Sequence, residues 1–212
     1  MVYSENILLC IAIPLLISLL FTEKRTRNFT AAFILGMVTC LVSAYISGFM
    51  KFVLQINSEE MAVYYSPIIE EIMKLLPLLF YLFVFLPDNN GVFSTALGIG
   101  LGFATFENCC YILTSGASRL GYVMIRGLAV GVMHLVCALI LALGLGLAKR
   151  FKGLTPSGVV GALSLSTVFH GLYNLLVSEP GLSTMLGYIL PMITVAVIYI
   201  PFLRGRNPRA NA

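Results

Sequence analysis

Seven stretches of mostly apolar residues, each about 20 residues long or longer, dominate this chain. They cover residues 3–22, 29–54, 62–86, 92–115, 121–148, 155–178 and 181–203. A helix needs about 20 such residues to cross a bilayer, and only helices and closed barrels satisfy their backbone polar groups there. With 10% charged residues and a mean hydropathy of +0.96, the chain has the composition of a membrane protein. We therefore predict an all-α, polytopic transmembrane helix bundle of about seven spans, with residues 1–212 forming a single integral membrane domain.

The positions of the basic residues predict the orientation of this bundle. Three basic groups would fall on one side of the membrane: Lys24, Arg25 and Arg27; Lys149, Arg150 and Lys152; and Arg204, Arg206 and Arg209. Only Lys51 and Arg119 would lie on the opposite side. Cytoplasmic loops carry an excess of Lys and Arg, so we expect the N-terminus outside and the C-terminus in the cytoplasm. We interpret the net charge of +4 as a sign of topology and expect no nucleic-acid partner.

The third stretch contains three charged residues, Glu70, Glu71 and Lys74, inside an otherwise apolar segment. Ionisable groups at membrane depth are costly and indicate a functional site by default. Lys74 is four residues from Glu70 and three from Glu71, so on a helix it can pair with either carboxylate. The Ser66-Pro67 pair is typical of a helix start, with serine as the N-cap and proline at the first helical position.

Polar residues on three further stretches are predicted to reach a similar depth. We counted 1.5 Å of helical rise per residue from the expected outer ends. The resulting depths are about 10–15 Å for Glu70 and Glu71, about 12 Å for Glu107 and His170, and about 20 Å for His134, with Asn174 one turn above His170. We therefore expect a shared site within a catalytic core at residues 62–178.

The residue types suggest hydrolysis. Burial favours the protonated form of a carboxyl group and a neighbouring cation favours the ionised form, so Glu70 and Glu71 beside Lys74 could supply a general base for water. His170 or Asn174 could donate to the oxyanion of an attacked carbonyl.

A metal site is an alternative use of the same residues. Glu107, His134 and His170 offer one carboxylate and two imidazoles, a combination found in catalytic zinc sites. There is no HExxH motif, and the five cysteines lack metal-ligand spacing, so we interpret the cysteines as packing residues. The cofactor is left open, with zinc as the candidate.

Some polar residues also have a simpler structural interpretation. His134 alone could be a tie between helices. Arg126 is close enough to the outer surface for its side chain to reach the interface, and Phe103 and Tyr111 are typical of core packing. We assign Lys74, Asn108 and Arg126 supporting roles.

Four motifs on separate helices resemble the PrsW family of intramembrane proteases, which is similar to the group containing the type II CAAX prenyl endopeptidases and bacteriocin-processing proteins. They are EExxK at Glu70, Glu71 and Lys74; FxxxEN at Phe103, Glu107 and Asn108; the mid-span His134; and HxxxN at His170 and Asn174.

The resemblance implies an intramembrane endopeptidase of the bacterial cytoplasmic membrane, acting on a membrane-anchored protein such as an anti-sigma factor. It also implies that Glu70 activates water while His170 and Asn174 form the oxyanion site. In the CAAX-type relatives, which are described as glutamate-dependent, a histidine stands where Glu107 stands here, whereas PrsW-like proteins have also been classed as metalloproteases.

We therefore predict a protease that uses glutamate-activated or metal-activated water, without a covalent intermediate. The candidate catalytic residues are Glu70, Glu71, Glu107, His134, His170 and Asn174. Two alternatives use the same residues differently. In a proton- or ion-coupled transporter they would form a relay, although we detect no inverted repeat. In a catalytically silent scaffold or immunity protein they would only tie helices together.

Overall fold

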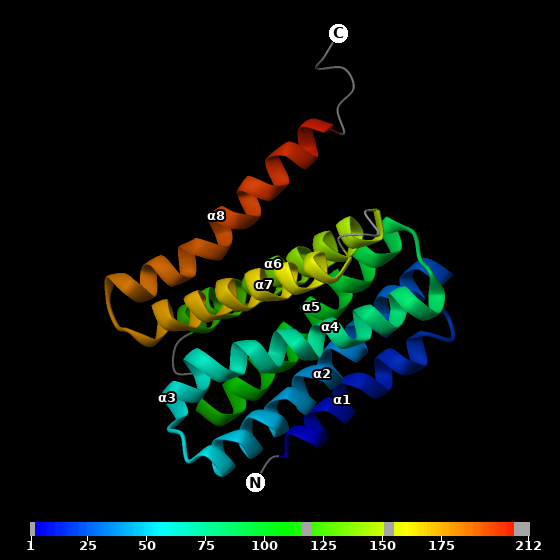
Figure 1. Cartoon of the computed structure of the whole chain (residues 1–212). Coiled ribbons are helices and arrows are strands. Elements are labelled where there is room, and N and C mark those ends of the chain that lie inside the picture. Colours follow the sequence, from blue (N-terminus) through cyan, green and yellow to red (C-terminus); the bar gives the residue numbers. More distant parts are fainter. Residues whose placement is uncertain (1–2, 116–119, 151–154, 206–212) are drawn as a thin grey trace.

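The structure is a computed structural model that describes residues 3–115, 120–150 and 155–205. Its long helices are α1 (Ser4–Ser18), α2 (Lys24–Leu54), α4 (Ser66–Phe85), α5 (Asn89–Ser115), α6 (Leu120–Arg150), α7 (Thr155–Ser178) and α8 (Leu182–Gly205). A three-residue helix, α3 (Ser58–Glu60), and a π-helical segment, η1 (Met61–Tyr65), precede α4. No strand occurs in the described ranges. The predicted all-helical bundle is confirmed (Figure 1).

Four helices, α2, α5, α6 and α7, are long and apolar enough to cross a membrane. Two shorter apolar helices cover Ser4–Ser18 and Leu182–Val197. The 20 residues of α4 could also span about 30 Å, but this helix contains Glu70, Glu71 and Lys74. The chain is therefore an integral membrane protein, and its orientation stays a prediction.

The bundle is assembled around the contact between α2 and α5, where two glycines allow the backbones to approach closely. A Cβ atom on Gly36 of α2 would lie 2.2 Å from the Ile99 carbonyl oxygen, and one on Gly102 of α5 would lie 1.9 Å from the Phe33 carbonyl oxygen. Any larger side chain would force the helices apart, as expected for small residues at membrane helix contacts. Helix α5 also packs on α6, α6 packs on α7, and α4 lies against α2 and α7.

The predicted N-cap at Ser66 is wrong. The chain is already helical before this residue, and the Ser66 backbone N–H donates to the Met61 carbonyl oxygen within η1. The cap lies further upstream, where the Asn57 side chain accepts from the Glu60 backbone N–H at 2.8 Å. Pro67 does lie in the first turn of α4, as predicted. The π-helical segment therefore joins α3 to α4 without a break.

Candidate active site

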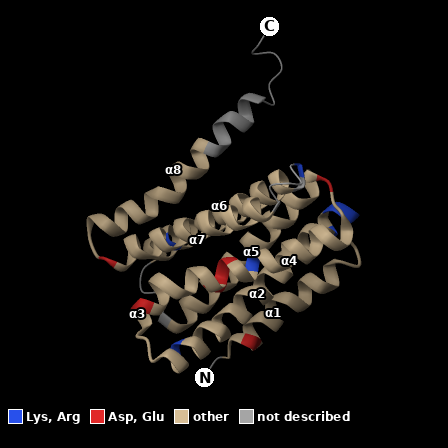
Figure 2. Ribbon diagram, viewed as in Figure 1, with Lys and Arg blue, Asp and Glu red and all other residues tan. Residues whose placement is uncertain are grey.

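Two of the charged residues of α4, Glu71 and Lys74, lie on its buried face. The buried residues of this helix are Pro67, Glu71, Lys74, Leu75 and Leu78. Their spacing of three and four residues defines one helical stripe. Glu71 and Lys74 are fully buried within it, and Figure 2 shows acidic and basic residues of α4 in the middle of the bundle. Charges in such a position need partners.

Lys74 connects two of these partners. Its Nζ atom lies 2.6 Å from Glu71 Oε1 and 2.7 Å from His134 Nδ1 of α6. It also lies 4.3 Å from the ring centroid of Phe103 on α5, a cation–π contact. An ammonium group only donates, so Nδ1 of His134 is the acceptor and Nε2 carries the proton. Lys74 thus fixes the tautomer of a histidine on another helix.

His170 of α7 bridges the two neighbouring glutamates. Its Nδ1 atom donates to Glu71 Oε1 at 2.8 Å, which leaves the Nε2 lone pair of the neutral ring facing Glu70 Oε2 at 3.7 Å. Glu70 Oε2 is buried and makes no hydrogen bond within the described part of the chain. An unpaired buried carboxylate oxygen requires an explanation, and a ligand or water that binds there would supply one.

His134 connects this cluster to Glu107 of α5. The protonated Nε2 of His134 donates to Glu107 Oε2. The His134 and His170 rings lie edge to face with their centroids 5.1 Å apart. His134 is fully buried, whereas the Glu107 side chain is 32% exposed. Glu107 therefore marks the open side of the cluster.

Arg126 of α6 holds Glu107 from that open side. Its Nη2 atom lies 3.9 Å from Glu107 Oε1, and its Nη1 atom donates to Asn108 Oδ1 at 2.8 Å. The guanidinium stacks 3.3 Å above the ring of Tyr111, whose hydroxyl lies 3.1 Å from that of Tyr122. The Arg126 side chain is only 16% exposed and turns toward Glu107.

Asn174 lies on α7 one turn from His170, but it also ties down the segment before α4. Its Nδ2 atom donates to the Ala62 carbonyl oxygen of η1 at 2.9 Å. One amide N–H is used in this contact, and a second N–H remains on the same nitrogen.

The structure thus brings the predicted residues together from four helices. Glu70, Glu71, His134 and His170 form one connected cluster with Lys74, and Glu107 joins it through His134. Asn174 lies one helical turn from His170 and is tied to Ala62.

The cluster also fits a divalent metal ion, although with a different donor set from the predicted one. Ligand atoms of Glu70, His134 and His170 all lie within 4.8 Å of one another, whereas Glu107 contacts His134 alone of these residues. In a tetrahedral zinc site the ligand atoms are about 3.4 Å apart. The 3.7 Å between Glu70 Oε2 and His170 Nε2 is close to this value. His134 could join them only if its Nε2 gave up both its proton and its contact with Glu107.

Sequence reasoning missed two residues near the cluster. Cys137 forms a second compact group with Glu71 and His170, although we had interpreted all cysteines as packing residues. Its position three residues after His134 could have indicated a shared helix face. Tyr122 supports Tyr111 beneath Arg126, and its spacing of four residues from Arg126 was the available signal.

Membrane-spanning helices that enclose carboxylates, imidazoles and a lysine define an integral membrane protein with a polar site in its interior. Residues 24–203 match the family model described as PrsW family intramembrane metalloprotease, which covers most of the chain. The chain belongs to this family and is an intramembrane protease. Neither curated proteins nor solved structures gave a match.

Proposed function

We propose that this protease hydrolyses a peptide bond of a membrane-anchored protein with a water molecule held between Glu70 and His170. The observation that carries the proposal is the buried Glu70 Oε2 atom, which makes no hydrogen bond to the described residues and lies 3.7 Å from His170 Nε2. Both atoms are acceptors, so a bound water would donate one proton to each and present its lone pair to a substrate carbonyl.

Each of the other residues would hold this pair in place. Glu71 accepts from His170 Nδ1 and keeps the Nε2 lone pair aimed at Glu70. Lys74 supplies the positive charge that allows Glu71 to remain buried and ionised. The second N–H of Asn174 is our candidate donor to the oxyanion.

In the proposed reaction, the water oxygen bonds to the carbonyl carbon while its proton passes to Glu70. The carbon–nitrogen bond then breaks, and the proton moves from Glu70 to the departing amine. One new carboxyl group and one new amino group result, and no covalent bond to the protein forms.

The family description also implies a metal, for which we propose zinc held by Glu70, His170 and, once released from Glu107, His134. A bound zinc ion would polarise the carbonyl and activate the water. Glu71 would orient His170 in either version, because it accepts from His170 Nδ1. Lys74 fixes the His134 tautomer with its proton on Nε2, so His134 would have to lose that proton before it could bind zinc.

The substrate class follows from the position of the site. Glu107 on the exposed side and the depth of Glu70 within α4 favour a peptide that reaches into the membrane. An anti-sigma factor with a membrane anchor is the candidate that the family resemblance suggests, and residues 62–178 form the proposed catalytic core.

The test compares membrane protein fragments from cells that express the wild type or Glu70→Gln. We expect new termini only with the wild type, and the same cleavage when purified protease and substrate are combined in liposomes. Ion flux in these liposomes without any Glu70-dependent fragment would overturn the proposal and favour a transporter.

A further inference from the structure

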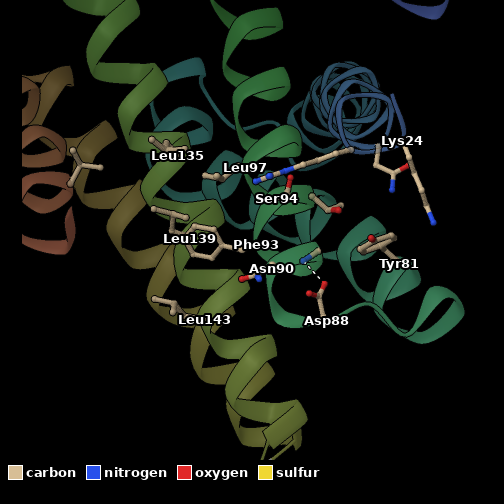
Figure 3. A pocket seen from close by; sticks show the side chains of 15 residues that line it. Lys24, Tyr81, Asp88, Asn90, Phe93, Ser94, Leu97, Leu135, Leu139 and Leu143 are labelled. Atoms are coloured by element: carbon tan, nitrogen blue, oxygen red, sulfur yellow. Dashed lines mark hydrogen bonds between the residues drawn. The ribbon is translucent and has the colours of Figure 1, made fainter. Parts of the chain in front are cut away.

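A groove of about 1150 Å³ lies away from the candidate active site, among α2, α4, α5 and α6, with Val195 of α8 also lining it. Its lining residues include none of the candidate catalytic residues. Figure 3 shows side chains from several helices pointing into it. Its volume exceeds that of a typical small-molecule pocket, about 300–1,000 Å³.

The wall that α6 contributes is apolar. Leu135, Leu139 and Leu143 follow one another at four-residue spacing and line the groove on the same side (Figure 3). Phe93 and Leu97 of α5 lie beside them. The three leucines extend over about 12 Å of helix, close to the roughly 15 Å of hydrocarbon in one leaflet.

The opposite end of the groove is polar and carries more positive than negative charge. Lys24, at the start of α2, and Tyr81 lie across the groove from the α6 leucines (Figure 3), and Arg25, next to Lys24, also lines it. The single carboxylate there, Asp88, accepts from the Gly91 backbone N–H at 2.9 Å. This end belongs to the side of the membrane that the distribution of Lys and Arg predicts to be cytoplasmic, where anionic lipids are enriched.

We propose that this groove binds one anionic phospholipid, with its phosphate at Lys24 and Arg25 and its acyl chains along the leucines of α6. The charge at one end and the apolar wall match the two parts of such a lipid. The length of the apolar wall also distinguishes a lipid from a substrate helix, because a transmembrane helix would need a surface that crosses both leaflets.

The first test measures lipid retention by native mass spectrometry, with the full-length protein released from bilayers of equal phosphatidylglycerol and phosphatidylcholine. We expect one retained phosphatidylglycerol. The double variant Lys24→Gln/Arg25→Gln should lower the ratio of bound phosphatidylglycerol to phosphatidylcholine about tenfold or more. Arg27→Gln is the matched control, since Arg27 is exposed on the same helix but does not line the groove. Equal retention of both lipids by the wild type would overturn the proposal.

The second test concerns the apolar wall. Leu143→Trp should reduce retention of both lipids by filling the groove, whereas Leu147→Trp should not, because Leu147 is similarly exposed one turn along α6 but lies outside the groove. A photoreactive residue at position 143 should label phosphatidylglycerol preferentially, and one at 147 should label lipids in their bulk ratio. Cross-links from position 143 to another protein would contradict lipid binding and favour a substrate helix.

Discussion

Glu70 and Glu71 are adjacent in α4 but have opposite surroundings. Glu71 Oε1 accepts from Lys74 Nζ at 2.6 Å and from His170 Nδ1 at 2.8 Å, and its side chain is fully buried. Oε2 of Glu70 and Oε2 of Glu71 both lack a hydrogen-bond partner among the residues that the structure describes. The Glu70 side chain differs in being 17% exposed and in facing His170 Nε2 at 3.7 Å. One carboxylate thus holds the cluster together, and its neighbour is left for a ligand.

This difference predicts effects of different size on the free energy of unfolding. Glu71→Gln should lower the free energy of unfolding by about 3–5 kcal/mol, because it leaves the buried Lys74 without its counter-charge. Glu70→Gln should change it by less than about 1 kcal/mol, since no hydrogen bond is lost. Reversible unfolding in mixed detergent micelles measures both. Equal losses in the two variants would show that Glu70 is also a structural tie.

The close contact between α2 and α5 predicts that one added methyl group at Gly36 lowers the stability of the protein. Gly36→Ala should destabilise the protein by at least about 1–3 kcal/mol, because the new Cβ atom would meet the Ile99 backbone, which cannot move aside as a flexible side chain could. Gly48→Ala is the matched control in the same helix, since no described atom lies within 4 Å of its Cβ position. The measurement is the unfolding midpoint. A control as unstable as Gly36→Ala would argue against this packing.

The position of Arg126 beside Glu107 predicts that Arg126 positions the Glu107 carboxylate. Arg126→Gln should lower kcat about 10-fold to 100-fold with a smaller change in KM, because Glu107 would lose the cation beside Oε1. Tyr111→Leu, which removes the ring beneath the guanidinium, should act in the same direction. Tyr111→Phe keeps that ring and should stay near wild-type kcat. Kinetics on a purified substrate decide this, and an unaffected Arg126→Gln enzyme would rule the role out.

In the version of the mechanism that uses a metal, Glu70, His134 and His170 hold a zinc ion, and the following measurements distinguish it from the version without one. Elemental analysis of the purified protein should find about one zinc ion per chain, and His170→Ala should reduce that content. Chelation should abolish cleavage, and added zinc should restore it. Full activity of metal-free protein would instead support the version in which Glu70 alone activates water.

Much of this arrangement could be predicted from local spacing, because helical periodicity is short-ranged. The apolar stretches predicted the long helices, and the three-residue separation of Glu71 and Lys74 allowed the ion pair that forms. Spacing could not decide between Glu70 and Glu71 as the partner of Lys74. That choice depends on how α4 is rotated against α6 and α7, which packing determines.

The specific contacts between helices could not be predicted from spacing along the chain. The depth estimates, about 12 Å for Glu107 and about 20 Å for His134, did not predict the hydrogen bond between them, and they could not show that Lys74 fixes the His134 tautomer. The bond from Asn174 to Ala62 depends on the π-helical segment η1, for which the sequence offered no signal. The prediction of an N-cap at Ser66 fails for the same reason. The Met61 carbonyl oxygen of η1 accepts from the Ser66 backbone N–H, so the helix does not start there and needs no cap.

The most direct test of the proposed mechanism is cleavage of a membrane-anchored substrate by reconstituted wild type and Glu70→Gln, with the unfolding midpoint measured on the same samples. We predict a loss of activity of at least about 1,000-fold in Glu70→Gln with an unchanged midpoint, because the variant keeps the fold and removes the carboxylate that accepts the proton of water. A Glu70→Gln protein that folds normally and cleaves at the wild-type rate would contradict the account.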